Sequence, residues 1–430
     1  MKDLHEMSSC ARRSFYDLSV ASCEKRNQAL LRMAELLQER AADIFAVNSD
    51  DIARAEAESL SAPLLHRLRF GDEKLRQVCD GLQSLSLLPD PIGRTTLATE
   101  ITEGLNLYRV ICPIGVIGVI FESRPDALIQ IASLCIKSGN SVLLKGGREA
   151  IRTNQILTEI VRLALSDCGL PADAAQLLET REDVAAMLKE DELIDLIIPR
   201  GSNAFVRYIM DNSRIPVLGH SDGICHVYID KDADPGKAVR VTVDSKVQNV
   251  SVCNAAETLL VHRDAAPEIL PLIADKLKEK KVEIRGDEAV SRIIDCVPAS
   301  EADWSTEYLD YIISVRIVSS LEEAIAHINH FGSHHTDCIV TENDQAARRF
   351  LNTVDSAGVY RNVSTRFADG FVYGFGAEVG IATGKLHARG PMGLEGLTTY
   401  KYELIGNGHT LTEMKDGTRK YTHRSLPLPD

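Results

Sequence analysis

The sequence predicts an α/β fold with two doubly wound, mainly parallel sheets. From about residue 110 onwards, short apolar segments of strand length alternate with longer segments of helical spacing, which is typical of βαβ units. Before them, residues 24–85 are rich in Ala, Leu, Glu and Arg with helical spacing of the apolar residues, so we expect a set of helices there. With 430 residues, 44% of them hydrophobic, the chain has the size of two or three domains.

The elements of the first sheet can be placed in order along the chain. The sequence predicts a strand at 114–121, a helix at 126–139, a strand at 141–145, a helix at 149–167 and a strand at 194–199, followed by the segments 201–210 and 215–219. Pro125 and the Gly146-Gly147 pair mark turns between these elements. Together they predict one doubly wound sheet.

A second unit begins near Pro235, which suits the first position of a helix over about 235–247. A strand at 257–262, a helix at 265–280 and a further α/β series to about 395 follow it. The last residues are polar and rich in turn formers, as in an extended tail or an oligomer arm. We therefore expect three units, with the bounds 1–230, 231–395 and 396–430.

Charge and composition exclude several classes of partner. A formal net charge of −14 leaves no sufficiently basic surface for nucleic acid or an anionic membrane. The N-terminus lacks the apolar region of a signal peptide, and the longest apolar run, 111–121, is too short to span a bilayer. Ten scattered cysteines without a C-x-x-C pair are expected to be reduced thiols. These features favour a cytoplasmic protein that acts on a small molecule.

Cys253 is the candidate reactive thiol. It lies between a predicted helix and a predicted strand, beside Asn249, Ser251 and Asn254, where backbone N–H groups could stabilise a thiolate and later an oxyanion. Position alone leaves open that Cys253 is an ordinary buried loop cysteine. Two other cysteines, Cys225 and Cys338, sit in apolar strand patterns and are predicted to be packing residues.

A glycine turn in SVLLKGGRE (141–149) is a candidate phosphate site. Gly146 and Gly147 allow the backbone to approach phosphate, and the helix that follows favours negative charge at its start. Lys145 and Arg148 add fixed cations. Many βα turns contain glycine, however, and the chain has no G-x-G-x-x-G motif, which counts against an ordinary Rossmann dinucleotide site.

Two other groups of residues have competing interpretations. His334, His335 and Asp337 lack a third and fourth ligand at metal-site spacing, so we predict no metal there. His220 and His387 are expected to be ordinary loop or core residues. The segment 361–401 is dense in Gly, Arg and hydroxyl residues, which favours a loop around a ligand or a subunit interface over an exposed connector.

A set of segments distributed along the chain is highly specific when taken in order. They are PIGVIGVIFESRPD (113–126), SGNSVLLKGGREA (138–150), DLIIPRGS (195–202), LGHSDGICHVYID (218–230), CNAAETLLVH (253–262), TEYLD (306–310), GSHHTD (332–337) and NVSTRFADG through HARGPMGLEGLTT (362–399). This set resembles the aldehyde dehydrogenase superfamily, and more narrowly its glutamate-5-semialdehyde dehydrogenase branch. The resemblance covers about residues 10–408 and leaves the tail after about 410 uncovered.

The resemblance implies a fold of three parts and a reaction. Residues 1–230 would bind NADP, residues 231–395 would form the catalytic domain with Cys253, and residues 396–430 would supply an oligomerisation strand and a polar tail. The implied reaction is the NADPH-dependent reduction of L-glutamyl 5-phosphate to L-glutamate 5-semialdehyde and phosphate, the second step of proline biosynthesis from glutamate. A homo-oligomer is implied as well.

The same resemblance assigns roles to particular residues. The nucleophile falls on Cys253, and the acidic ribose ligand on Glu307. The remaining cofactor-binding positions are Lys145, Gly147, Arg148, Gly201 and Ser202. The residues expected to hold the substrate anions or its oxyanion are Ser123, Arg124, Ser364, Thr365 and Arg366.

Two departures from the hydrolytic aldehyde dehydrogenases carry chemical information. Those enzymes have a water-activating glutamate where this chain has Val217, so the thioester is expected to meet hydride or phosphate rather than water. NAD-preferring enzymes often have a glutamate three residues after the lysine, where this chain has Arg148. A guanidinium can bind a 2′-phosphate, which points to NADP.

Three alternatives stay open at this point. An acylating aldehyde dehydrogenase that uses coenzyme A would also lack the water-activating base. The chain could be a catalytically silent protein on this fold, although Cys253, Lys145 and Glu307 occur together. A cysteine hydrolase would need a histidine near the thiol. Because the chain has no amino-kinase part and acyl phosphates of glutamate cyclise readily, a separate glutamate kinase is a candidate partner.

Overall fold

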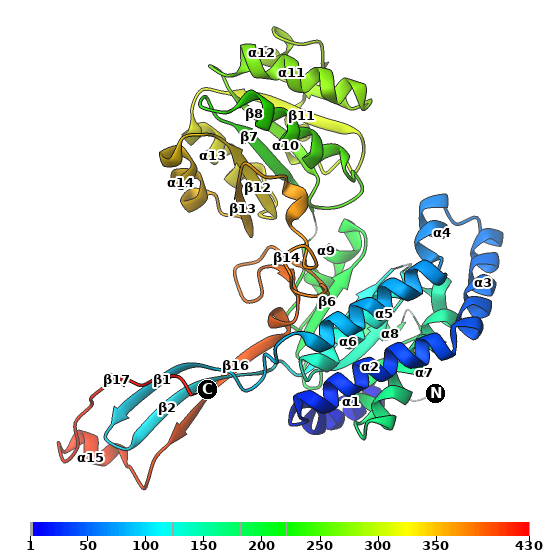
Figure 1. Ribbon diagram of the computed structural model, residues 1–430, viewed down its shortest axis with the longest axis vertical. Coiled ribbons are helices and arrows are strands. Elements are labelled where there is room, and N and C mark those ends of the chain that lie inside the picture. Colours follow the sequence, from blue (N-terminus) through cyan, green and yellow to red (C-terminus); the bar gives the residue numbers. More distant parts are fainter. Residues whose placement is uncertain (1–2, 123, 181, 221, 430) are drawn as a thin grey trace.

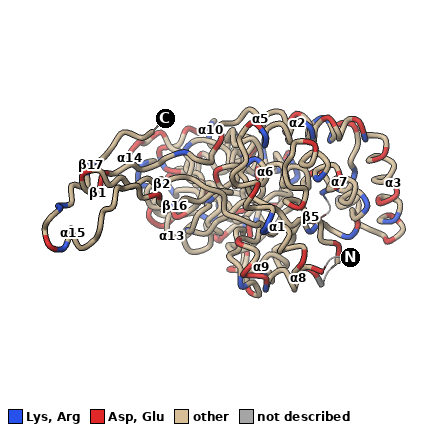
Figure 2. Tube along the Cα trace, turned by 90° about the horizontal axis from the view of Figure 1, so that it is seen from below, with Lys and Arg blue, Asp and Glu red and all other residues tan. Residues whose placement is uncertain are grey.

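The computed structural model describes residues 3–429 except 123, 181 and 221. The chain forms two parallel-sheet bodies and a long antiparallel arm (Figure 1). None of the helices in the described residues is long and apolar enough to cross a lipid bilayer. Acidic and basic residues are interspersed along the trace in Figure 2. The prediction of two doubly wound parallel sheets with a smaller third element is confirmed.

The first body packs five N-terminal helices against a four-stranded parallel sheet of order β5-β4-β3-β6. The helices are α1 (Leu4–Ser19), α2 (Cys23–Glu39), α3 (Ala41–Ala57), α4 (Ala62–Leu68) and α5 (Asp72–Leu87). The sheet region contains β3 (Val116–Phe121), α6 (Pro125–Lys137), β4 (Ser141–Lys145), η1 (Arg148–Ala150), α7 (Ile151–Asp167), η2 (Ala172–Ala174), β5 (Ala175–Leu177), α8 (Glu182–Met187), β6 (Leu196–Arg200) and α9 (Asn203–Asn212). Strands β3 and β4 are buried throughout, which explains their continuous apolar sequence.

The second body is a seven-stranded parallel sheet of order β10-β9-β11-β8-β7-β12-β13 with helices packed on it (Figure 1). Its elements are β7 (Cys225–Ile229), α10 (Pro235–Val247), β8 (Ala256–His262), α11 (Ala266–Glu279), β9 (Glu283–Gly286), α12 (Glu288–Ser291), β10 (Val297–Pro298), η3 (Glu301–Ser305), β11 (Ile312–Val318), α13 (Leu321–Phe331), β12 (Thr336–Val340), α14 (Asp344–Thr353) and β13 (Gly358–Arg361). Helix α10 begins at Pro235, as predicted, and the Asp234 side chain caps it by accepting from Lys237 N–H.

The arm is an antiparallel sheet of order β16-β2-β1-β17 that projects from the first body (Figure 1). It consists of β1 (Thr95–Thr102), β2 (Leu105–Pro113), β16 (Thr398–Ile405), α15 (Leu411–Lys415) and β17 (Arg424–Ser425). Between the second body and the arm the chain forms η4 (Thr365–Phe367), β14 (Gly380–Ala382), β15 (Gly390–Met392) and η5 (Glu395–Leu397). Strand β16 pairs with β2 over its whole length, so the arm combines residues from both ends of the chain.

The strand pairings differ from the expected bounds of the units for β7 and for β1 and β2, and from the expected strand at 215–219. Strand β7 falls within 1–230, but it pairs with β8 and β12 of the second sheet. Strands β1 and β2 also fall within 1–230, but they belong to the arm. The apolar segment 215–219 makes only an isolated bridge, between Val217 and Ile197. We therefore propose that the first unit ends before β7 and that the arm includes 95–113.

A buried histidine in the second body gives a pH-dependent stability. His327 on α13 packs against Trp304 and Phe331, and burial, with smaller effects from His226 and Arg316, lowers its pKa to about 3. Because the folded pKa lies below that of the unfolded chain, the stabilisation is present above about pH 6.5 and is lost as the pH falls towards 3.

We expect His327→Phe to be less sensitive to acid than the unsubstituted protein. Between pH 7 and pH 5 the free energy of unfolding should fall by about 1–2 kcal/mol less in the variant, since the phenyl ring takes up no proton. Urea unfolding at the two pH values measures this difference. Equal slopes for His327→Phe and the unsubstituted protein would contradict the assignment.

Candidate active site

Cys253 lies in a turn between the end of α10 and the start of β8, as the sequence predicts. The thiol-bearing residue is half-buried. The two ends of its loop are joined by a buried ion pair, in which Lys246 Nζ lies 2.6 Å from Glu257 Oε2 and both side chains are fully buried. Thr365 donates a hydrogen bond to the Asn254 carbonyl at 2.7 Å, and Asn254 donates to the Ala368 carbonyl at 2.9 Å. These contacts fix the turn that presents the thiol.

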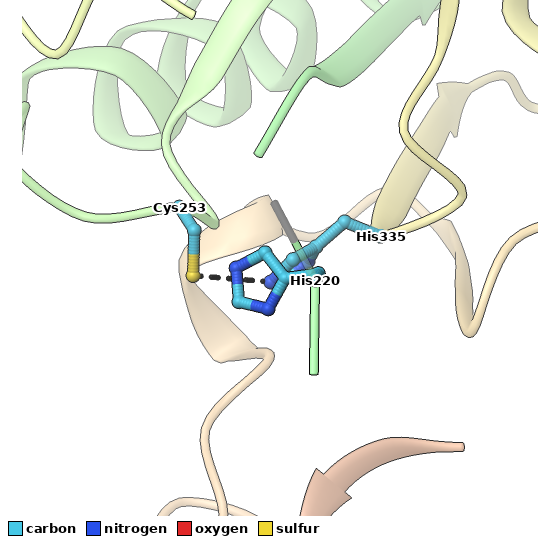
Figure 3. A group of neighbouring side chains, drawn as sticks. All are labelled: His220, Cys253 and His335. Atoms are coloured by element: carbon cyan, nitrogen blue, oxygen red, sulfur yellow. Dashed lines mark hydrogen bonds between the residues drawn. The ribbon is translucent and has the colours of Figure 1, made fainter. Parts of the chain in front are cut away.

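Two histidines face this thiol (Figure 3). His335 Nε2 is 3.2 Å from Cys253 Sγ, and the rings of His220 and His335 meet edge to face with centroids 5.1 Å apart. The other nitrogen of each ring is engaged, because His335 Nδ1 is 2.9 Å from the Thr336 hydroxyl and His220 Nδ1 is 2.9 Å from the Ile381 carbonyl oxygen. These bonds orient both rings and place an imidazole nitrogen in contact with the thiol.

Arginines supply positive charge near the thiol. Burial, together with the neighbouring Arg124, lowers the pKa of Arg200, whereas the charges of Glu378 and Cys253 act to raise it. Burial likewise lowers the pKa of Arg366, and Asp369 and Cys253 oppose that shift. Both guanidinium groups therefore act electrostatically on Cys253 from a poorly solvated position. An anion bound beside the thiol would stabilise both charged guanidinium groups.

The predicted substrate residues fall into two groups. Arg366 interacts electrostatically with Cys253, and Arg124 interacts with Arg200, which in turn interacts with Cys253. Ser364 and Thr365 are buried and bonded to Ser245, and Thr365 also to Asn254. The Thr365 hydroxyl holds the Cys253 turn and the Ser364 hydroxyl accepts from Ser245 of α10, so the geometry favours a supporting role over direct contact with substrate. Ser123 lies outside the described residues.

The predicted nucleotide residues collect at the carboxyl ends of the first sheet. Lys145 ends β4 and is buried, with Nζ 2.7 Å from the Gly146 carbonyl oxygen. Gly201 and Ser202 are exposed and precede α9. Glu307 reaches this edge from the second body, where its carboxylate accepts a 2.6 Å hydrogen bond from Asn203 of α9. In an open parallel sheet, ligands bind at this edge.

Gly147 and Arg148 follow β4 at the same edge. Gly147 precedes η1, and Arg148 is exposed with its guanidinium 3.1 Å from Glu58 of the first body. Arg148 is thus a cation on the surface beside the glycine turn. Arg148 and Lys145 are the two residues of the segment 141–149 with a permanent positive charge.

Sequence reasoning missed several residues of this site. His220 was expected to be an ordinary loop or core residue, and His335 was considered only as a metal ligand with His334 and Asp337; the structure instead places both beside the thiol. Val217 packs against the hydrophobic core of the first body and carries no group that could act as a base. Asp337 does not join the two histidines, since it accepts hydrogen bonds from His226 and Ser356. By contrast, Cys225 and Cys338 are buried in strands, as predicted.

Gly223 is a further residue that the sequence did not reveal. A Cβ atom at this position would overlap the Cα and carbonyl of Cys253, so only glycine lets the two segments approach. We expect Gly223→Ala to displace the thiol and to lower kcat by about 100-fold, the effect of a misplacement of about 1 Å. Steady-state kinetics measure it. Gly384→Ala, which meets nothing within 4 Å, should keep its rate, and equal rates for both variants would contradict the packing argument.

The two parallel sheets and the Cys253–His335 contact fit an oxidoreductase with a cysteine nucleophile. Comparison with known proteins shows that the chain belongs to such a class. A model of the aldehyde dehydrogenase family matches residues 1–292, and the chain belongs to that family. Within the family it is similar over nearly its whole length to gamma-glutamyl phosphate reductases. The protein of that name from Acetivibrio thermocellus is 56% identical over 423 residues, covering 98% of each chain.

A further relative and two solved structures show the same similarity in sequence or in fold. The gamma-glutamyl phosphate reductase of Pelotomaculum thermopropionicum is 54% identical over 424 residues, 99% of this chain and 98% of that protein. The crystal structure of gamma-glutamyl phosphate reductase from Thermotoga maritima superimposes with a TM-score of 0.93 at 39% identity, covering 95% of this chain and 100% of that chain. A propionaldehyde dehydrogenase from Rhodopseudomonas palustris shares the fold alone, with a TM-score of 0.65 and 14% identity over 94% of this chain and 98% of that chain.

Proposed function

We propose that this protein reduces L-glutamyl 5-phosphate to L-glutamate 5-semialdehyde and phosphate with NADPH, through a thioester on Cys253. The observation that carries the proposal is the half-buried thiol 3.2 Å from His335 Nε2, in the field of Arg200 and Arg366. The names of its relatives support the same substrate. The reaction would be the second step of proline biosynthesis from glutamate.

The thiol and His335 carry the first step. His335 accepts the proton of Cys253, the sulfur forms a bond to the acyl carbon, and the bond from that carbon to the phosphate oxygen breaks. The proton held by His335 passes to the departing phosphate, so charge does not accumulate in the site. Backbone N–H groups of the Cys253 turn stabilise the oxyanion, and one such donor contributes roughly 3 kcal/mol.

The arginines position the substrate. An acyl phosphate and its α-carboxylate are both anionic, and planar guanidinium groups bind such groups with two hydrogen bonds. Arg200 and Arg366 interact electrostatically with Cys253, and Arg124 with Arg200; these three arginines would hold the two anionic ends. Thr365 acts through the Cys253 turn, to which its hydroxyl bonds, and Ser364 through Ser245 of α10.

The edge of the first sheet fits a nicotinamide nucleotide. Lys145 and the N-terminus of α9 can hold phosphate, while the Glu307 carboxylate beside Asn203 can accept from ribose hydroxyls. Bound there, the nucleotide would supply the hydride that converts the thioester to the aldehyde and releases the thiolate. Gly147 leaves room beside the phosphates.

Arg148 is proposed to select the 2′-phosphate of NADPH. We expect Arg148→Glu to lower kcat/KM with NADPH by about tenfold or more, because a charged hydrogen bond is lost and a repulsion is added. The value with NADH should change little. Arg152→Glu is a matched control, since Arg152 is also exposed and paired, with Asp50 at 3.4 Å. A parallel loss with both nucleotides would argue against the assignment.

The reverse reaction tests the proposed function. Purified protein with glutamate 5-semialdehyde should reduce NADP only when phosphate is added, since phosphate is the acyl acceptor. Coenzyme A should not replace phosphate. Reduction of NADP without any acceptor other than water, or with coenzyme A alone, would overturn the proposal.

One observation favours a second candidate, a cysteine hydrolase, because the thiol and His335 form the pair that such an enzyme uses. The third member of that set is here the Thr336 hydroxyl rather than an amide or carboxylate. Hydrolysis of a glutamyl thioester without nucleotide would support this candidate.

We propose the cytoplasm as the compartment and a homo-oligomer as the working form. The arm would make the subunit contact, because β16 presents exposed apolar side chains at Tyr400, Tyr402, Leu404 and Ile405. We further propose direct transfer of glutamyl phosphate from a glutamate kinase, since this intermediate cyclises readily in water. Equal flux when the two enzymes are held apart by a membrane would remove the reason for the transfer.

A further inference from the structure

Cys253 and the two histidines beside it bring together three atoms of types that bind metal ions. One ligand atom from each of Cys253, His220 and His335 lies within 4.8 Å of the others. These residues come from the turn before β8, the segment before β7 and the residue before β12. Tetrahedral zinc with one sulfur and two nitrogen ligands needs roughly 3.4–3.6 Å between ligand atoms. Small side-chain rotations would satisfy that geometry.

The orientation of both histidines is that of metal ligands. Metal-bound imidazole usually has its second nitrogen bonded to an oxygen, which fixes the ring and directs the first nitrogen to the metal. Here Nδ1 of His335 contacts the Thr336 hydroxyl and Nδ1 of His220 contacts the Ile381 carbonyl oxygen, each at 2.9 Å. The Nε2 atoms are therefore the ones left for the thiol side, and both rings face Cys253 in Figure 3.

We infer that Cys253, His220 and His335 bind one Zn²⁺ ion reversibly, with water in the fourth position, and that the bound ion blocks the thiol. Zinc prefers thiolate and imidazole ligands. Binding releases the thiol proton and forms bonds from zinc to one sulfur and two nitrogens, with no change of oxidation state. The loss of activity rests on the proposed function, whereas the binding itself does not.

The surrounding charge makes the ion a reversible ligand rather than a structural one. Arg200 and Arg366 already act on Cys253, so a dication with one thiolate adds positive charge to a positive site. The two polypeptide bodies are also built around apolar cores that do not include these three residues. Removal of zinc should therefore leave the fold intact.

Protection of the thiol tests the binding without any substrate. Full-length protein is treated with iodoacetamide, and modification of Cys253 is followed by peptide mass spectrometry. Saturating Zn²⁺ should slow this modification by about tenfold or more, because only the unbound thiolate reacts, and a chelator should restore the rate. Co²⁺ in place of Zn²⁺ should give a thiolate-to-metal absorption band at one ion per chain.

Variants assign the ligands. His220→Ala should remove both the protection and the cobalt band, whereas His334→Asn should keep them, since His334 bonds the Asp355 carbonyl instead and asparagine accepts its positive φ of 60°. Circular dichroism checks that each variant is folded. Unchanged alkylation of the unsubstituted protein in zinc, or a cobalt band that survives in His220→Ala, would overturn the inference. Neither the alkylation rate nor the cobalt band depends on glutamyl phosphate. A failure of metal binding can therefore be distinguished from a failure of the proposed reaction.

Discussion

Replacing Cys253 by alanine is expected to abolish phosphate-dependent reduction of NADP by glutamate 5-semialdehyde. Loss of a covalent nucleophile lowers kcat by about four orders of magnitude or more, because the remaining binding groups cannot replace the bond it forms. Binding of NADPH, measured by fluorescence titration, should stay within a few-fold, since the proposed nucleotide residues lie on the first sheet and on Glu307.

A matched control separates this effect from general loss of a thiol. Cys168 is also half-buried, but it follows α7 in the first body. Cys168→Ala should therefore keep its rate. If Cys253→Ala retained more than about one hundredth of the activity, the covalent mechanism would be wrong, and hydride transfer to the acyl phosphate itself would have to be considered.

Breaking the buried ion pair below the active-site turn should have the largest effect on stability. Lys246 and Glu257 are fully buried with Nζ and Oε2 2.6 Å apart. Burial lowers the pKa of Lys246 and raises that of Glu257 to about 7. We expect Glu257→Gln to lower the free energy of unfolding by about 3–5 kcal/mol, because the ammonium loses its counter-charge in the interior. Urea unfolding measures this loss.

The double variant provides the control for the pair. When Lys246→Met is combined with Glu257→Gln, no unpaired charge stays buried, and most of the lost stability should return. If the change in the free energy of unfolding of the double variant equalled the sum of the changes of the two single variants, the pair would not be coupled and the argument would fail. Glu283→Gln, on an exposed ion pair with Arg285, should change stability by less than about 1 kcal/mol.

The sequence predicts the fold well where local pattern and burial agree. Helix α10 carries both of its start signals, Asp234 and Pro235, and β3 and β4 are buried on both faces. Helix α1 was missed because its buried face consists largely of small residues such as Ser8, Ala11 and Ser14. Strands β1 and β2 were missed because they are mostly half-buried and show little apolar pattern.

The candidate site could be predicted only in part. Cys253 was marked by its turn and Lys145 by the glycines after it, both local signals. His335 lies 82 positions from Cys253 in the sequence, and the contact exists only because β12 and β8 both flank β7 in the sheet. Gly223 is similar, since nothing in its neighbours shows that another backbone approaches it. The tertiary arrangement, rather than composition, decides these contacts.

The arm has a consequence for how the protein is made. Strand β2 leaves the ribosome long before its partner β16, which pairs with it from Thr398 to Ile405 and is synthesised after both parallel-sheet bodies. Until then the edge of β2 offers unsatisfied backbone groups to any passing strand. Completion of the arm is thus a late, long-range closure that follows the folding of both parallel-sheet bodies. The nascent chain must therefore extend through both parallel-sheet bodies before this surface is protected.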